Sequence, residues 1–206
     1  MRSTTLLLIA ISTLAILPPP AARAQPAAQA ASPPPEKFRL TRSTVNVPER
    51  GQITQLMLEA GSERLSFVPP PLCDARLVAP ERKVVFDRQK GIGLFSVQLN
   101  PIQIVPFDGD AKPAREQVEA RWPGSKVTEE FDQPTGLGQG RSFVLSSQIP
   151  QQGPWVTRVV VVTTRAGAVE LSLSCPAADV ARLRPAFVNL INTIKFEPPV
   201  VAAARQ

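Results

Sequence analysis

Most of the hydrophobic pattern along this chain is typical of β-strands. The run from Trp155 to Thr164 is rich in β-branched residues and is apolar on both faces in its second half, as in a central strand with a helix covering at least one face. After a turn at 165–167, hydrophobic and polar side chains alternate over 168–175, which predicts the second strand of a hairpin. Further strand-like segments are 53–59 and 64–68, which form a hairpin around Gly61, together with 94–105 and 140–149.

A first segment with helical periodicity covers residues 112–122. Its residues Ala114, Val118 and Trp122 are spaced by four, which places them on one face of a helix. Pro123 and the glycine after it end the helix.

A second helical pattern follows Cys175 and continues to Ile194. Pro185 within it is expected to start the main body of the helix or to kink it. Residues 80–90 fit a helix or a strand equally well, and Pro101 indicates that its segment is an edge strand or is broken there.

The helices are too few to alternate with the strands, which excludes a doubly wound parallel sheet. The order of elements predicts an α+β fold, in which helices pack on an antiparallel β-sheet.

The first 24 residues have the features of a secretory signal peptide. Arg2 supplies a positive charge, residues 5–17 are apolar, and Ala22 and Ala24 are the small residues of a cleavage site before Gln25. An uncleaved anchor is the alternative, but the apolar stretch is shorter than the about 20 residues of a spanning helix. We expect cleavage, no transmembrane segment afterwards, and a periplasmic or secreted protein.

Composition divides the rest of the chain into three parts. Residues 25–36 are rich in alanine and proline and predict a disordered tether. Residues 37–197 have the size of a single domain, and 198–206 resemble a second disordered tail.

The residue types present exclude several kinds of site. The chain has no histidine and 2 cysteines, so it holds no Ser-His-Asp triad, no histidine-ligated metal and no thiolate cage. We expect no cofactor and no metal. The net charge is +6, but the basic residues are scattered and only 5% of residues are aromatic, so nucleic acid is not an expected partner.

Two sequence motifs have the appearance of chemical sites. The glycines of 136–140 lack the Lys-Ser/Thr of a phosphate-binding loop and precede a strand, which indicates a turn. Asp108 and Asp110 indicate a turn or helix cap rather than a calcium loop.

The densest acidic cluster is formed by Glu129, Glu130 and Asp132. Paired carboxylates perform general acid–base chemistry when they are buried and close together. On a strand, Glu130 and Asp132 would share one face, and a solvated face is the usual outcome.

Cys73 and Cys175 predict a structural disulfide, because an exported protein meets an oxidising compartment. Cys175 also shares the inward parity of the hydrophobic residues on its strand. Reactive thiols are the alternative, but there is no C-x-x-C spacing and no histidine to lower a thiol pKa.

A candidate interaction face lies on the final hairpin. Glu170 and Ser172 have the polar parity of their strand, and Arg158 and Arg165 lie in the neighbouring arm. Such a face fits an acidic or peptide partner, and the ordinary solvated face of a sheet is the alternative.

The C-terminal unit resembles the end of PsbP-like, Mog-type and DcrB-like domains. The resemblance lies in the hairpin followed by Leu183–Phe187 and Asn192–Phe196, and Leu65–Pro71 and Leu94–Pro101 resemble the opening and middle strands. It covers about 52–196 and departs in lacking a tryptophan after the first strand, where a cysteine lies instead. The resemblance implies an α-β-α sandwich and a non-catalytic binding or assembly role, and it transfers no ligand residues.

These observations together predict an exported, non-enzymatic accessory or binding domain of the bacterial cell envelope. Its expected partner is an envelope protein or a wall component. The alternatives are a carboxylate-dependent hydrolase or lyase, and a structural envelope protein held near the wall by residues 25–36.

Overall fold

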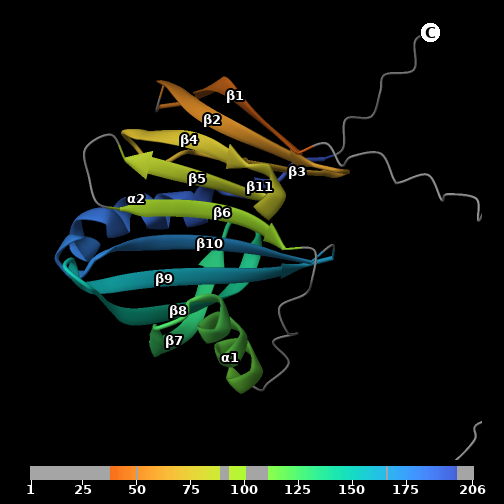
Figure 1. Ribbon diagram of the computed structural model, residues 1–206. Coiled ribbons are helices and arrows are strands. Elements are labelled where there is room, and N and C mark those ends of the chain that lie inside the picture. Colours follow the sequence, from red (N-terminus) through yellow and green to blue (C-terminus); the bar gives the residue numbers. More distant parts are fainter. Residues whose placement is uncertain (1–37, 50, 89–92, 101–110, 166, 199–206) are drawn as a thin grey trace, which may run out of the picture. The chain divides into compact units, whose positions relative to one another are not determined.

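The computed structural model describes residues 38–49, 51–88, 93–100, 111–165 and 167–198, all within one compact unit (Figure 1). In these ranges the helices are α1 (Ala111–Arg121) and α2 (Val180–Thr193), with short 3₁₀ helices at Ala79–Glu81 and Ala177–Asp179. The strands are β1 (Phe38–Val47), β2 (Gly51–Ala60), β3 (Glu63–Phe67), β4 (Cys73–Val78), β5 (Lys83–Arg88), β6 (Leu94–Asn100), β7 (Lys126–Thr135), β8 (Gly138–Ile149), β9 (Gly153–Thr164), β10 (Gly167–Pro176) and β11 (Lys195–Phe196).

The strands form two antiparallel sheets. The smaller sheet has the order β1-β2-β3-β11, and the larger has the order β4-β5-β6-β10-β9-β8-β7. In the larger sheet, pairing of β6 with β10 joins the strands that precede α1 to those that follow it. This pairing makes one continuous surface from two separate parts of the chain.

The main hydrophobic core lies on one face of the larger sheet, here called the inner face. The smaller sheet and α2 both pack on this face, and alternate side chains of β5, β6, β9 and β10 point into it. Phe67 of β3 and Phe86 of β5 meet edge to face across this core, with ring centroids 5.9 Å apart.

A second, smaller core lies on the opposite face of the larger sheet, here called the outer face. Ala114 and Val118 of α1 pack there against Phe143, Val159 and Val161. The apolar residues on both faces of β9 therefore serve two cores, as the sequence indicates for a central strand covered by a helix.

The predicted α+β class with an antiparallel sheet is confirmed, but the α-β-α sandwich needs correction. The structure is more sheet-dominated, because a second β-sheet covers part of the inner face where the sandwich would have helices (Figure 1). Residues 83–88 form a strand after a single 3₁₀ turn, which resolves the ambiguity over residues 80–88, whereas 89 and 90 lie outside the described residues. β6 is flanked by β5 and β10, so the edge-strand alternative is wrong. β6 ends at Asn100, and Pro101, where the other alternative placed a break, lies outside the described residues.

The predicted disulfide is wrong, because Cys73 and Cys175 are not bonded to each other. Cys73 begins β4, Cys175 lies on β10, and β5 and β6 separate these two strands. With neighbouring strands about 4.8 Å apart, three steps place the two Cα atoms about 14 Å apart. A disulfide needs about 4.4–6.8 Å. The inward parity of Cys175 is correct, but parity does not reveal which strand lies alongside.

No helix in the described part of the chain is long and apolar enough to cross a membrane. The predicted signal peptide and tether, and all of the predicted tail except Pro198, lie outside the described residues. The boundaries of these segments stay predictions.

Candidate functional site

A cavity of about 400 Å³ lies between α2 and the inner face of β7, β8, β9 and β10. Its walls are mainly apolar and include Phe131, Val156, Leu173 and Phe187. Three charged residues also line it, namely Glu129, Arg158 and Arg184. We call it the Arg158 cavity, after the half-buried arginine that lines it.

Arg158 interrupts an apolar row of β9. Its parity is that of Val160 and Val162, so its side chain points to the inner face. On either side in the sheet it pairs with Val144 of β8 and Leu173 of β10. A half-buried guanidinium therefore lies where the row would otherwise carry a hydrophobic side chain.

Neutral acceptors and aromatic rings hold this guanidinium. Nε donates to Ser142 Oγ at 3.1 Å, and Nη2 donates to Gln133 Oε1 at 2.6 Å. The guanidinium carbon lies 5.0 Å from the ring centroid of Phe131 and 5.8 Å from that of Phe187, within the range of cation–π attraction. These contacts fix both the position and the plane of the group.

The electrostatic setting of Arg158 favours an anion. Burial lowers its pKa, the neighbouring Arg184 lowers it further, and Glu129 acts in the opposite direction. None of the ion pairs found among the described residues includes Arg158. Its positive charge therefore faces the cavity without a carboxylate in contact.

The predicted interaction face is not exposed. Glu170 and Ser172 point to the outer face, where they are only 5% and 3% exposed. Glu170 Oε2 lies 2.6 Å from Arg121 Nη1 of α1, and the hydroxyls of Ser172 and Ser96 are 2.7 Å apart. The prediction of an exposed face is wrong, because α1 and neighbouring side chains cover the polar positions of β10 on the outer face, while α2 and the smaller sheet cover its apolar positions on the inner face.

The two arginines of that prediction are not brought together with Glu170 and Ser172. Arg158 points to the inner face, and Arg165 is exposed in the turn between β9 and β10. The sequence contained a signal for the position of Arg158, since it has the parity of Val160 and Val162. It contained none for the acceptors Ser142 and Gln133, which come from other strands.

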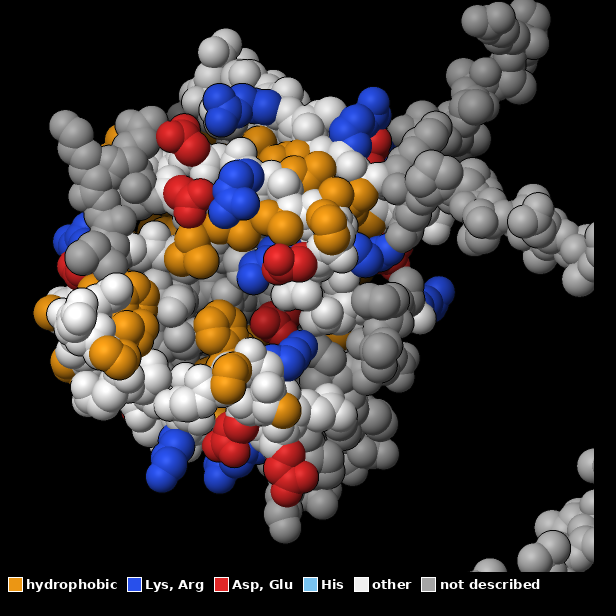
Figure 2. All heavy atoms as spheres, in the orientation of Figure 1, with side chains coloured by type: hydrophobic (Ala, Val, Ile, Leu, Met, Phe, Trp, Pro, Cys, Tyr) orange, Lys and Arg blue, Asp and Glu red, His pale blue; other side chains and the backbone are white. Residues whose placement is uncertain are grey.

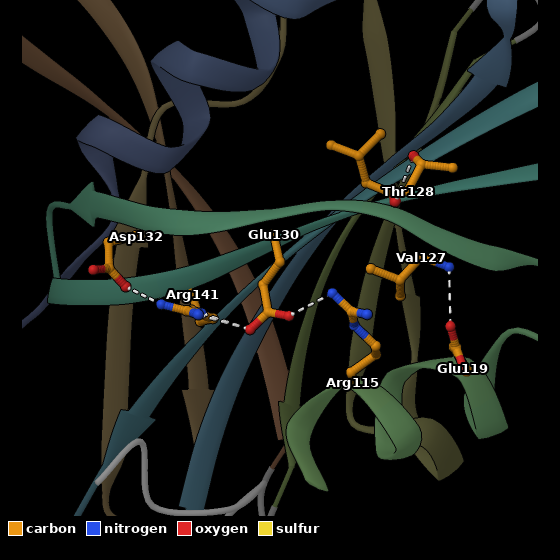
Figure 3. Close-up of polar contacts among 8 residues, drawn as sticks. Arg115, Glu119, Val127, Thr128, Glu130, Asp132 and Arg141 are labelled. Carbon is orange, nitrogen blue, oxygen red and sulfur yellow. Dashed lines mark hydrogen bonds and ion pairs between the residues drawn. The ribbon is translucent and has the colours of Figure 1, made fainter. Parts of the chain in front are cut away.

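The acidic cluster is divided between the two faces of β7. Glu130 and Asp132 point to the outer face, where Glu130 lies between Arg115 and Arg141 at 3.3 and 2.8 Å (Figure 3). Asp132 contacts the same Arg141 at 2.7 Å, and the hydrogen bonds that Arg141 donates to Asp132 and Glu130 raise the pKa of this arginine. Glu129 lines the Arg158 cavity on the inner face. The three carboxylates therefore do not form one acid–base site.

Near this cluster, α1 is fixed to β7 through polar contacts as well as packing. Glu119 of α1 accepts a hydrogen bond of 3.1 Å from the backbone N–H of Val127 (Figure 3).

Over the side shown in Figure 2, acidic and basic side chains are interspersed, and hydrophobic ones gather over β4 and β5. No large patch of a single charge is visible on this side.

Gly136 and Leu137 of the glycine-rich motif form the turn between β7 and β8, and residues 138–140 begin β8, as the sequence context predicts for a turn that enters a strand. The Gly136 N–H donates to the Ile191 carbonyl at 3.0 Å, and a Cβ at this position would contact the carbonyl oxygens of Ile194 and Asn192. The motif therefore packs against the end of α2.

Asp108 and Asp110 lie outside the described residues. The residues that the structure does describe contain no cluster suited to a metal ion.

No protein-family model matches the chain, and no curated protein matches it. Among solved structures, a mutant of the protein Mog1 is similar, with 15% identity, a TM-score of 0.42, and coverage of 75% of this chain and 95% of the other. Cyanobacterial PsbP from Synechocystis sp. PCC 6803 has 13% identity and a TM-score of 0.41, and the match covers 77% of this chain and 92% of that one. LpqN, involved in cell envelope biogenesis of Mycobacterium tuberculosis, has 10% identity and a TM-score of 0.42, with the same coverage. The solved structures that are similar to this chain thus include a Mog-type and a PsbP-like protein.

Proposed function

We propose that this chain is an exported, non-enzymatic binding domain of the cell envelope and that the Arg158 cavity is its ligand site. The observation that carries the proposal is a fixed, half-buried guanidinium facing an apolar cavity of about 400 Å³. Small-molecule sites typically have about 300–1,000 Å³, apolar walls and a few well-placed polar groups. Export rests on the signal-like sequence of residues 1–24.

The distribution of reactive groups supports binding over catalysis. A hydrolase that works through paired carboxylates needs both carboxyl groups to face one reaction space. Among the described residues, Glu129 is the single carboxylate that lines the Arg158 cavity, and Glu130 lies across the sheet. The chain also has no histidine to act as a general base.

Blocking the cavity tests this proposal. Val180 lines it at the start of α2, and Val180→Trp would fill part of the space, whereas the adjacent Ala181 is exposed and outside the lining. Native mass spectrometry of protein isolated gently from envelope fractions should show a bound small molecule in the wild type and in the control Ala181→Trp. Val180→Trp should lack it while unfolding at a similar temperature.

Two results would contradict the proposal. One is wild-type protein that carries no bound molecule and takes up none from an envelope extract. The other is a folded Val180→Trp variant that retains the same molecule as the wild type.

A further inference from the structure

The unused donors of Arg158 define the shape of the group it would bind. A guanidinium has five N–H donors, and the described residues accept from Nε and from one N–H of Nη2. Both N–H groups of Nη1 and the second of Nη2 have no acceptor among these residues. Donors on two adjacent nitrogens match the two oxygens of a carboxylate, which forms paired, charge-assisted hydrogen bonds with arginine.

The charged side chains that line the cavity sum to one positive charge, which would balance one negative charge on a ligand. Arg158 and Arg184 contribute two positive charges to the lining, and Glu129 contributes one negative charge. Cys175 adds none at neutral pH, because burial and the nearby Asp179 raise the pKa of its thiol to about 11. The resulting single positive charge fits a monoanion better than a phosphate monoester, which carries about −1.5 to −2 at neutral pH.

The rest of the lining accommodates a hydrocarbon. Phe131, Val156, Leu173 and Phe187 offer side chains without hydrogen-bonding groups, so hydroxyl groups placed against them would lose their bonds to water. A volume of about 400 Å³ is at the lower end of the usual range for small-molecule sites. This size favours a medium-length tail over a long one.

We propose that the ligand of the Arg158 cavity is a monocarboxylate with an apolar tail, whose carboxylate is bound by Arg158 with Arg184 beside it. This inference rests on the proposed function and names the class of its ligand. The tail lies against the aromatic and aliphatic walls between α2 and the sheet.

Calorimetric titration of the mature protein with a matched set of probes tests the inference. The probes are decanoate, decanol, decyl phosphate and decyltrimethylammonium, which share a tail and differ in head group. Decanoate should bind most tightly, by about tenfold or more over decanol, as expected for a charge-assisted pair of hydrogen bonds. Hexanoate and tetradecanoate should both bind more weakly than decanoate.

Variants then assign this preference to residues. Arg158→Gln should reduce decanoate affinity about tenfold and leave decanol affinity nearly unchanged. Arg158→Lys keeps the charge but lacks the paired donors, so it should recover only part of the loss. Arg184→Gln, at an exposed position that does not threaten folding, should give a smaller reduction. Arg182→Gln is the matched control, since Arg182 lies on the same helix and pairs with Asp179 outside the cavity.

The outcomes separate this inference from the proposed function. Equal affinity for decanol and decanoate, or tighter binding of decyl phosphate, would overturn the carboxylate assignment and leave the cavity as a binding site. An unchanged preference in both Arg158→Gln and Arg184→Gln would overturn it in the same way. If none of the probes bound, the assignment of a monocarboxylate ligand would be overturned. The proposed binding function would be overturned only if native mass spectrometry also found no bound molecule.

Discussion

Arg158 shows how one residue gives a hydrophobic wall a chemical preference. A guanidinium that is half-buried without a carboxylate loses hydration that neutral acceptors restore only in part. Ser142, Gln133 and the rings of Phe131 and Phe187 hold it in place despite this cost. Because the position is fixed before any ligand arrives, little further ordering of the side chain is needed on binding.

Glu170 offers a pH-dependent test at the same scale. Burial raises the pKa of this carboxyl above its ordinary value of 4.5, although Arg121 and Lys83 oppose the shift. A raised pKa in the folded state means that the stability contributed by the protonated form is complete below the unfolded pKa and is lost as the pH rises through the folded pKa. Glu170→Gln does not titrate, so its free energy of unfolding relative to wild type should increase as the pH rises from acid to neutral.

Urea unfolding at a series of pH values measures this difference. Glu116→Gln, which removes an exposed glutamate from α1, controls for the change in net charge. A difference between Glu170→Gln and wild type that stays constant or decreases with rising pH would contradict the assignment.

At the scale of elements, regular periodicity made the hairpin β9–β10 and both helices predictable. β1 was not recognised because its alternation is limited to its two ends, 38–40 and 45–47, which differ in parity and are separated by the exposed polar residues 41–44. Strand order was also beyond a single sequence, since β6 pairs with β10 about seventy residues later. The failed disulfide prediction follows directly from that missing order. The cavity, by contrast, is lined by the consecutive strands β7–β10 together with Ala177 and α2, so what the sequence did not reveal is how α2 packs on these strands.

The contact between the β7–β8 turn and the end of α2 gives a stability prediction. A Cβ at Gly136 would contact the Ile194 carbonyl oxygen and lie 2.8 Å from that of Asn192, and both are backbone atoms with little freedom to move. Gly136→Ala should therefore lower the free energy of unfolding by about 1–3 kcal/mol, the usual cost of overpacking.

Chemical unfolding of a matched pair of variants tests this contact. At Gly93 a Cβ would meet the flexible end of Leu183, which can shift, so Gly93→Ala should cost less. Equal or greater destabilisation by Gly93→Ala would show that the β7–β8 turn is not packed as described.

At the scale of the whole molecule, the larger sheet carries different chemistry on its two faces. The outer face is closed by α1 and by ion pairs such as Arg121–Glu170, whereas the inner face has the Arg158 cavity beside α2. Export would bring this cavity into contact with envelope molecules.

Export of the whole chain is tested by the N-terminus of the processed protein. Mass spectrometry of the chain from the periplasmic or secreted fraction should find Gln25 as its first residue. Ala24→Lys should accumulate as the precursor because it removes the small residue at the cleavage site, whereas Ala28→Lys in the predicted tether should be processed normally. A wild-type chain that retains residues 1–24 in the cytoplasm would contradict export.

The order of strands has a consequence for how this protein is made. Synthesis proceeds from the N-terminus, and domains fold as units once their segments have emerged. The larger sheet lacks the strand that joins its two parts until β10 is complete, and the smaller sheet receives its last strand, β11, at residue 196. Nearly the entire chain must leave the ribosome before either sheet can close. The complete domain can therefore fold only late in synthesis, and a chain that has not yet folded is the state that a secretory translocon threads.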